Sequence, residues 1–211
     1  MTTKKQARVR TQDARRRAAE MRRQEQAKER RRRLIIVAVV AVLIAAAGAG
    51  IGLVAATHHS KASTIAGVQT FTVASRKHVQ GTVHYAQDPP VGGDHNSTWL
   101  NCGIYATPVP NENAVHDLEH GAVWITYQPN LSPSDVSKLQ SLVKSKSKGY
   151  LDLSPYPNLP SPVVASAWGV QLKLNSASDS RLSKFIDKYQ LGPTAPERGA
   201  SCTGGTGNPT G

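Results

Sequence analysis

The sequence predicts an α+β domain, a small two-layer sandwich with a mixed sheet and two main helices, preceded by one transmembrane helix and a basic cytoplasmic tail. Three observations support this prediction. Charge is concentrated in residues 1–33, an uncharged apolar run follows at residues 34–56, and residues 65–202 alternate strand patterns with well-capped helical patterns. About 150 residues remain after the apolar run, which is enough for one domain with its own core.

The basic tail differs in composition from the rest of the chain. Residues 1–33 carry fourteen Lys and Arg and four Asp and Glu, a net charge of +10, whereas the remaining residues net only +2. The tail has almost no large apolar side chains with which to form a core. We expect it to contact anionic lipid headgroups. Nucleic-acid binding is disfavoured, because no aromatic residues are interleaved for base stacking.

The apolar run at residues 34–56 contains no charged side chain. As a helix it would rise about 34 Å, which is enough to cross a hydrocarbon core of about 30 Å. The excess of Lys and Arg before it predicts a single-pass plasma-membrane protein with a cytoplasmic N-terminus and residues 57–211 outside. A cleaved signal peptide is the alternative, with the small residues 45–47 as its cleavage site.

The outer part begins with a linker, residues 57–64, continues as the domain over residues 65–202, and ends in a glycine-rich tail, residues 203–211, that we expect to be disordered. Apolar patterns predict strands over residues 68–73, 78–85, 122–127, 150–153 and 163–174. Helices are predicted over residues 114–120, 133–147 and 179–190, with Asn113, Ser132 and Ser178 as N-caps. We expect the two longer helices on one face of the sheet, and a long ordered loop over residues 86–113.

The chain has two cysteines, Cys102 in the long loop and Cys202 after the last helix. An extracytoplasmic milieu oxidises thiols, so two cysteines there predict one disulfide that ties the C-terminal segment to the loop. A redox-active or metal-binding thiol is the alternative, although the chain lacks a C-x-x-C motif.

All seven histidines lie outside the predicted membrane, and two of them belong to the motif His116-x-x-Glu119-His120. On a helix, His116 and His120 share one face, so their imidazoles are suitably placed to bind one metal ion. We expect His95, in the Gly-rich part of the long loop, to be the third ligand. Nearby alternatives are Asp94, His84 and Cys102. An imidazole-rich site outside the cytoplasm suits zinc or copper.

Two other interpretations of this motif stay open. H-x-x-E-H is also the motif of the inverted zincins, so Glu119 is a candidate general base of a zinc-dependent hydrolase. Alternatively, His116 and His120 only form hydrogen bonds at a helix end. The chain contains no Walker A loop, no Rossmann glycine pattern and no G-x-S-x-G motif, which excludes the enzyme classes that depend on them.

Four segments, in this order, resemble a known family. They are residues 89–95 (PPVGGDH), 102–105 (CGIY), 115–123 (VHDLEHGAV) and 165–169 (ASAWG). Over residues 68–202 the chain resembles the bacterial domain of unknown function 3105 of actinobacterial membrane-anchored proteins. The resemblance implies an extracytoplasmic domain behind one membrane helix, and it implies no activity. We therefore expect an interaction or scaffold domain with an extracytoplasmic partner, with metal binding as the main alternative.

Overall fold

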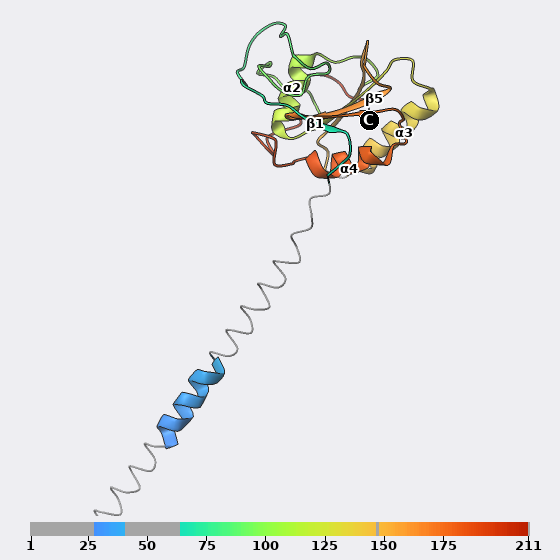
Figure 1. The fold of residues 1–211 in the computed structure, drawn as a ribbon. Coiled ribbons are helices and arrows are strands. Elements are labelled where there is room, and N and C mark those ends of the chain that lie inside the picture. Colours follow the sequence, from blue (N-terminus) through green and yellow to red (C-terminus); the bar gives the residue numbers. More distant parts are fainter. Residues whose placement is uncertain (1–27, 41–63, 147, 211) are drawn as a thin grey trace, which may run out of the picture. The chain divides into compact units, whose positions relative to one another are not determined.

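The computed structural model describes residues 28–40, 64–146 and 148–210, and the chain divides into two units, residues 1–63 and 64–211 (Figure 1). In the first unit, residues 28–40 are helical, and all their side chains are exposed. Within the described ranges, no helix is both long and apolar enough to cross a membrane. Three predicted segments lie wholly or mainly outside the described residues: the basic tail up to residue 27, the membrane segment from residue 41, and the linker up to residue 63.

The second unit is built on a six-stranded mixed sheet, which confirms the predicted α+β class. Its strands are β1 (Val68–Thr70), β2 (Gly103–Ile104), β3 (Val123–Tyr127), β4 (Leu151–Pro155), β5 (Val163–Ala167) and β6 (Val170–Leu174). Their order across the sheet is β1-β6-β5-β3-β4-β2. Strand β4 pairs in parallel with both β3 and β2, and the other neighbouring strands pair antiparallel.

The helices of this unit are α2 (Asn111–His120), α3 (Pro133–Ser145) and α4 (Ser180–Tyr189). Helix α3 begins as predicted, because the side chain of Ser132 accepts a hydrogen bond from the backbone N–H of Asp135. Helix α4 begins one residue later than predicted, and the carboxylate of Asp179 caps it in place of Ser178. The Asp179 side chain accepts a hydrogen bond from the backbone N–H of Arg181, so it satisfies a free donor of the first turn.

Helix α2 starts before the predicted residue 114, with Pro110 at the N-cap position. The extended backbone of Pro110 leads directly into the helix, and its carbonyl accepts the first helical hydrogen bond, from Ala114. Asn113 therefore lies inside the first turn and does not cap it. Gly121 ends the helix in the left-handed conformation with φ of 105°, as its position in the sequence predicts.

Residues 163–174 were expected to form one strand and instead form a hairpin of β5 and β6. Its turn consists of Trp168 and Gly169. Gly169 has φ of 69°, and a Cβ atom at this residue would lie 3.2 Å from the carbonyl oxygen of Phe71, so the turn favours glycine. Apolar residues continue through the turn, which explains why their pattern did not reveal the reversal.

The segment over residues 78–85 forms no strand, and the strand predicted over residues 68–73 is shortened to β1. His78 makes only an isolated bridge, with His95. Other backbone groups here find partners outside any ladder; the N–H of Val83, for instance, donates to the carboxylate of Glu112 at 2.8 Å. These partners satisfy the backbone without a strand, so the alternation in the sequence was misleading.

The glycine-rich C-terminal segment is ordered over residues 203–210, in contrast to our expectation of a disordered tail. The N–H of Thr206 donates to the carbonyl of Trp99 at 2.8 Å, and the N–H of Thr210 donates to that of Ile104 at 2.6 Å. A Cβ atom on Gly205 would overlap the carbonyl oxygen of Trp99. Glycine in this segment therefore allows close backbone approach, where we had interpreted it as a sign of disorder.

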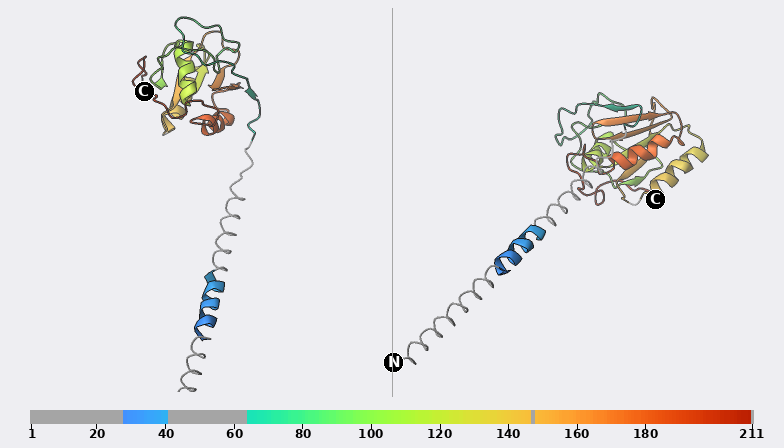
Figure 2. Two further views of the ribbon diagram at one scale, coloured as in Figure 1. Left: turned by 90° about the vertical axis from the view of Figure 1, so that its left-hand side faces the viewer. Right: turned by 60° about the horizontal axis from the view of Figure 1, so that its bottom comes forward.

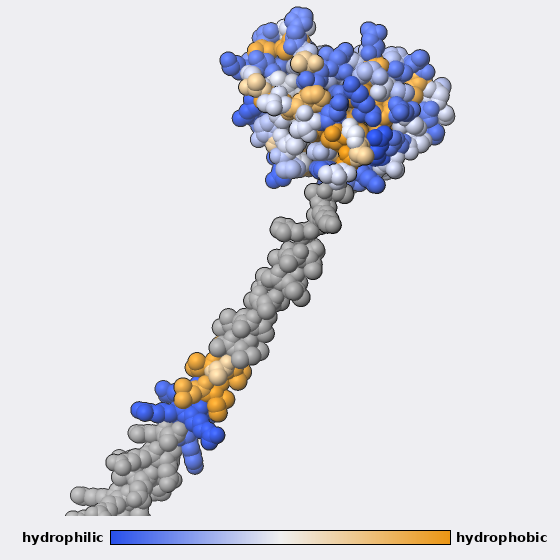
Figure 3. All heavy atoms as spheres, in the orientation of Figure 1, coloured by the Kyte–Doolittle hydropathy of each residue, from blue (hydrophilic) through white to orange (hydrophobic). Residues whose placement is uncertain are grey.

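Helices cover both faces of the sheet (Figures 1 and 2), and side chains of the sheet alternate between two cores. On one face, Ile125 and Leu153 pack with residues of α3 and α4, which confirms that these two helices share a face. On the other face, Trp124 and Val164 pack with the apolar side of α2. Helix α2 and the long loop thus add a third layer that the predicted two-layer sandwich lacked. The face of this unit seen in Figure 3 is mostly hydrophilic.

Candidate metal centre

Helix α2 supplies three side chains of the candidate site: His116, Glu119 and His120. Their spacing of three and four residues places them on neighbouring turns of one side of the helix. All three are buried, with exposed fractions of 3%, 1% and 3%. The apolar side of α2, which includes Leu118, packs on the sheet, so the polar side faces the loop that covers it. Burying three titratable groups on one helix costs free energy unless each finds a hydrogen-bond or charge partner.

The long loop brings His95 to this helix. The N–H of His95 donates to the carbonyl of Lys77 at 3.0 Å, and its carbonyl accepts from Val79 at 2.8 Å, so the loop is held beside the segment that carries His78. Gly92 makes this path possible: it has φ of 145°, and a Cβ atom there would lie 2.9 Å from the Val73 side chain. His95 ends fully buried, with an exposed fraction of 0%.

Four side chains gather their ligand atoms in one place. One nitrogen or oxygen from each of His78, His95, His116 and Glu119 lies within 4.8 Å of the other three. Within this group, His95 Nε2 and Glu119 Oε2 lie 2.9 Å apart. His120 adjoins the group through His116, since their Nε2 atoms are 2.9 Å apart. We call these five residues the histidine cluster.

The structure shows which of the ligands predicted from the sequence lie together. His95 and His116 come together, and His120 lies beside them. Asp94 instead accepts hydrogen bonds from Ser75 and from the N–H of Lys77. His84 is exposed, and Cys102 forms a disulfide.

Sequence reasoning missed two members of the cluster as ligands. His78 is distant in sequence from the motif, and it reaches the site only because its backbone pairs with that of His95. Glu119 was considered only as a general base, yet its carboxylate lies among the imidazoles. The spacing of Glu119, three residues after His116 and on the same side of a predicted helix, was the available signal for a ligand role.

Hydrogen bonds fix which nitrogen carries the proton in the neutral form of three imidazoles. Nδ1 of His95 lies 2.8 Å from the carbonyl oxygen of Gly93, Nδ1 of His116 lies 2.7 Å from that of Asn96, and Nδ1 of His120 lies 2.6 Å from that of Ser201. A carbonyl oxygen only accepts, so each Nδ1 carries a proton and donates. In each neutral ring Nε2 is then the bare nitrogen, and it points into the cluster.

Electrostatics favour neutral imidazole at the centre of the cluster. Burial lowers the pKa of His116, and the neighbouring imidazoles of His120, His95 and His78 lower it further, while its hydrogen bond to Asn96 acts in the opposite direction. Neutral imidazole is the form that binds metals.

One guanidinium approaches the cluster from its exposed side. Arg76, half exposed, donates from Nη1 to Glu119 Oε1 at 2.9 Å and also contacts Glu197 at 3.3 Å. The second oxygen of Glu119 faces His95 at 2.9 Å and His78 at 4.0 Å.

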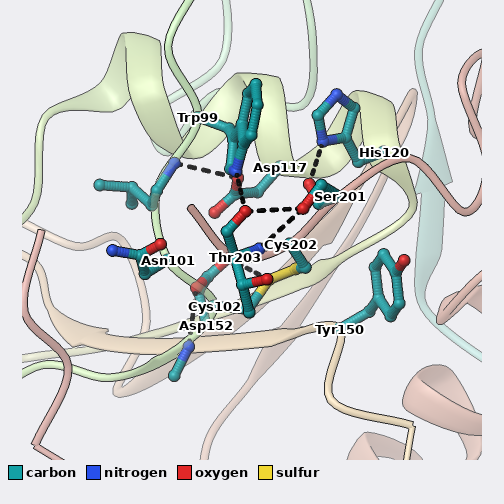
Figure 4. Close-up of a disulfide and its surroundings, with 12 residues drawn as sticks. Trp99, Asn101, Cys102, Asp117, His120, Tyr150, Asp152, Ser201, Cys202 and Thr203 are labelled. Atoms are coloured by element: carbon teal, nitrogen blue, oxygen red, sulfur yellow. Dashed lines mark hydrogen bonds between the residues drawn. A yellow bond between two sulfur atoms is a disulfide. The ribbon is translucent and has the colours of Figure 1, made fainter. Parts of the chain in front are cut away.

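A second group of potential ligands lies behind α2. Cys102, Asp117 and Asp152 bring one ligand atom each within 4.8 Å of the others. Cys102 is bonded to Cys202, however, so it offers no thiolate (Figure 4). Burial is the main cause that raises the pKa of Asp152 to about 7, and burial together with the neighbouring Asp152 raises that of Asp117. The raised pKa values of these two carboxyls favour their protonated forms, which bind metal poorly. The histidine cluster is therefore the better candidate metal site.

Comparison with known proteins finds one family that matches this part of the chain. Residues 78–204 match the family described as protein of unknown function DUF3105. The chain belongs to the DUF3105 family. The matched residues include the whole histidine cluster and both cysteines of this DUF3105 domain. No curated protein and no solved structure matches the chain. The family membership therefore confirms the resemblance and adds no activity to it.

Proposed function

We propose that the DUF3105 domain binds one first-row transition-metal ion, zinc or copper(II), at the histidine cluster. His95, His116 and Glu119 are the central ligands, and His78 and His120 complete the coordination as the side chains adjust. For zinc–nitrogen bonds of about 2.1 Å, tetrahedral ligands are about 3.4 Å apart. The two separations of 2.9 Å in the cluster lie close to that spacing.

One observation supports this proposal above the others. In their neutral forms both rings carry their proton on Nδ1, so the Nε2 atoms of His116 and His120 face each other as bare nitrogens at 2.9 Å. Two bare nitrogens cannot hydrogen-bond to one another. Nε2 of His95 is likewise buried without a hydrogen-bond partner, although it lies close to Glu119. A cation among these lone pairs removes the repulsion and gives each buried atom a partner.

The donor set selects the class of metal. Imidazole nitrogens with one carboxylate suit zinc and copper(II), whereas calcium and magnesium prefer sets made only of oxygen. Each ligating ring donates its other N–H to a backbone carbonyl, which is the usual outer-shell arrangement around a metal-bound histidine. His78 is the exposed ligand and marks the side from which an ion enters.

The experiment measures metal content and affinity on the full chain in detergent. After removal of metal with a chelator, zinc and copper(II) are titrated separately, and the bound metal is counted by elemental analysis. We expect one ion per chain for the wild type and at least a hundred-fold weaker binding for His116→Ala. His84→Ala is the matched control, because this histidine is exposed and lies outside the cluster. Equal affinities for the two variants would contradict the proposal.

The hydrolase alternative receives less support from the arrangement of the cluster. Both oxygens of Glu119 already have neighbours, Arg76 on one side and His95 on the other, so the carboxylate is not free to activate a water molecule. Glu119→Gln separates the two roles. A binding role predicts weaker metal affinity for this variant. Peptidase activity that disappears while metal stays bound would favour the hydrolase instead.

We also propose that the domain faces the outside of the cell behind the membrane helix predicted at residues 34–56. The support is the charge asymmetry around this run. Described residues that expose large apolar side chains also lie there, namely Leu34, Ile35, Ile36, Val37, Val39 and Val40. Protease treatment of intact cells should digest the DUF3105 domain and spare the basic tail. Protection of the domain would reverse the topology, and a secreted product lacking residues 34–56 would exclude the anchor.

A further inference from the structure

The chain after α4 returns across the C-terminal end of α2. The N–H of Glu197 donates to the carbonyl of Glu119 at 3.0 Å, and the N–H of Gly199 donates to that of His120 at 2.9 Å. These two bonds satisfy carbonyls in the last turn of α2, which have no partner inside the helix. We call residues 197–206 the strap.

The strap holds two parts of the histidine cluster's surroundings. The carbonyl of Ser201 accepts the proton of His120 Nδ1 at 2.6 Å and so sets which nitrogen of this ring faces the cluster. The carbonyl of Thr203 accepts from the indole N–H of Trp99 at 3.1 Å. The indole ring lies with its centre 5.7 Å from that of His116 and 5.4 Å from that of His120, so the strap also positions this covering ring.

One disulfide cross-links the strap to a distant segment of the domain. Cys202 directly follows Ser201, and its disulfide with Cys102 reaches the segment that begins with Trp99 (Figure 4). The N–H of Cys102 also donates to the carbonyl of Cys202 at 2.8 Å. Without the disulfide, only hydrogen bonds hold Ser201 against His120, and they compete with water whenever the segment opens.

We propose that the Cys102–Cys202 disulfide regulates the affinity of the histidine cluster for metal. In the oxidised domain the strap holds His120 and Trp99 in place, and the site binds tightly. In the reduced domain the strap loosens, His120 loses its fixed orientation, and binding weakens. This inference rests on the proposed function, since it concerns the same site. It gives the domain a metal affinity that follows the thiol–disulfide balance of its surroundings.

The reductant is a dithiol. Its thiolate attacks the sulfur of Cys102, the less buried of the two residues. The sulfur–sulfur bond breaks, and Cys202 leaves with the bonding electron pair and takes up a proton. The second thiol of the reductant, as a thiolate, then attacks the reductant's sulfur in the mixed disulfide and releases Cys102, which is protonated in turn. In total the dithiol becomes a disulfide, and two electrons and two protons pass to the protein.

The test compares metal affinity with and without the disulfide, in the absence of added thiol because dithiols bind these metals themselves. The full chain is titrated with zinc and with copper(II) as wild type and as the double variant Cys102→Ser with Cys202→Ser. We expect the double variant to bind about ten-fold to a hundred-fold more weakly, the usual cost of losing outer-shell support. The matched control is Leu182→Ala, which destabilises the domain in the opposite core and leaves the affinity unchanged.

Circular dichroism shows whether the double variant folds. If it does not fold, Gly205→Ala provides the measurement, because its added methyl group displaces the strap from Trp99 while the disulfide stays intact. Weaker binding by Gly205→Ala supports the inference. Wild-type affinity in the folded double variant, or in Gly205→Ala where the double variant does not fold, overturns it while metal binding itself stands. A wild-type domain that binds neither metal overturns the proposed function, and the inference with it.

Discussion

The two faces of the sheet differ sharply in what they bury. The face that carries α3 and α4 is almost entirely apolar, with large side chains such as Phe185 and Leu172 fully buried. The face that carries α2 and the long loop holds nearly all of the buried polar residues among those described: His95, His116, Asp117, Glu119, His120, Thr126, Asp152, Ser154, Ser166 and Gln171. Five of these ten residues lie on α2 or the long loop and five on the strands, so both the covering layer and the sheet carry the difference.

The comparison shows that the larger apolar core and most of the buried polar groups lie on opposite faces of one sheet. Burial of apolar surface stabilises the folded domain by roughly 25 cal/mol per Å² and needs no specific partner. A buried polar group costs free energy unless it finds a partner, and the sheet residues on the α2 face find theirs. The indole N–H of Trp124, for example, donates to Ser154 Oγ at 2.9 Å. The atoms still without a hydrogen-bond partner include His95 Nε2 and Asp117 Oδ2, both of which belong to the α2 layer.

The largest expected effect tests the apolar face. Phe185→Ala removes a fully buried ring from α4 and leaves a cavity, so the free energy of unfolding should fall by about 3–5 kcal/mol. Urea denaturation of the metal-free protein measures this loss. Metal affinity of the folded variant should equal that of the wild type, because Phe185 belongs to the other core. A large change in affinity would break the separation between the two faces.

A second prediction concerns pH and the buried carboxyl pair on the α2 face. The pKa of Asp152 in the folded domain is raised to about 7 from its model-compound value of 3.8, mainly by burial. The stability that its protonated form contributes is fully present below pH 4 and is lost as the pH rises through about 7. Asp152→Asn cannot ionise, so relative to this variant the wild type should lose on the order of 4 kcal/mol between pH 4 and pH 8.

Urea denaturation across this pH range measures the difference between the two proteins. The groups that face Asp152 include Asp117, the disulfide sulfur of Cys102 and the N–H of Gly103, and of these three only the carboxyl of Asp117 titrates. Asp135→Asn is the control, because its carboxyl is partly exposed and its pKa is lowered by Lys138 and Ser132. Parallel pH profiles for the wild type and Asp152→Asn would show that ionisation of Asp152 does not lower the free energy of unfolding.

The smallest expected effect concerns the end of a helix on the apolar face. Asp179→Ala removes the N-cap of α4 and should lower the free energy of unfolding by about 1 kcal/mol. Ser178→Ala should change it by less than about 0.5 kcal/mol, because this exposed side chain caps nothing. Thermal unfolding of both variants gives the comparison. A larger loss for Ser178→Ala would restore the cap that the sequence suggested.

The local signals in the sequence predicted most of the secondary structure of the domain. Ser132 and Gly121 marked the ends of helices correctly, because capping depends on residues adjacent in the chain. The hairpin at Gly169 was missed, since apolar residues run through both of its strands. The C-terminal segment was wrongly predicted to be disordered. In a sequence, glycines that allow close backbone packing cannot be distinguished from glycines in a disordered segment.

The candidate site divides in the same way between local and distant contributions. The motif that contains His116, Glu119 and His120 was visible because its three residues share one helical face. His95 was chosen for its glycine-rich loop, and it lies in the cluster. His78 was beyond prediction, because its position depends on a single backbone bridge between two irregular segments.

By itself, the sequence determined the α+β class, the boundaries set by capping residues and the spacing of the motif on α2. These features depend on interactions within a few residues, and their free energies follow from local chemistry. Only the tertiary structure decided which face of the sheet is polar, which carbonyl holds each imidazole and where the strap lies. Those features arise from contacts between segments as far apart as Trp99 and Thr203, and no local pattern encodes the partner across that distance.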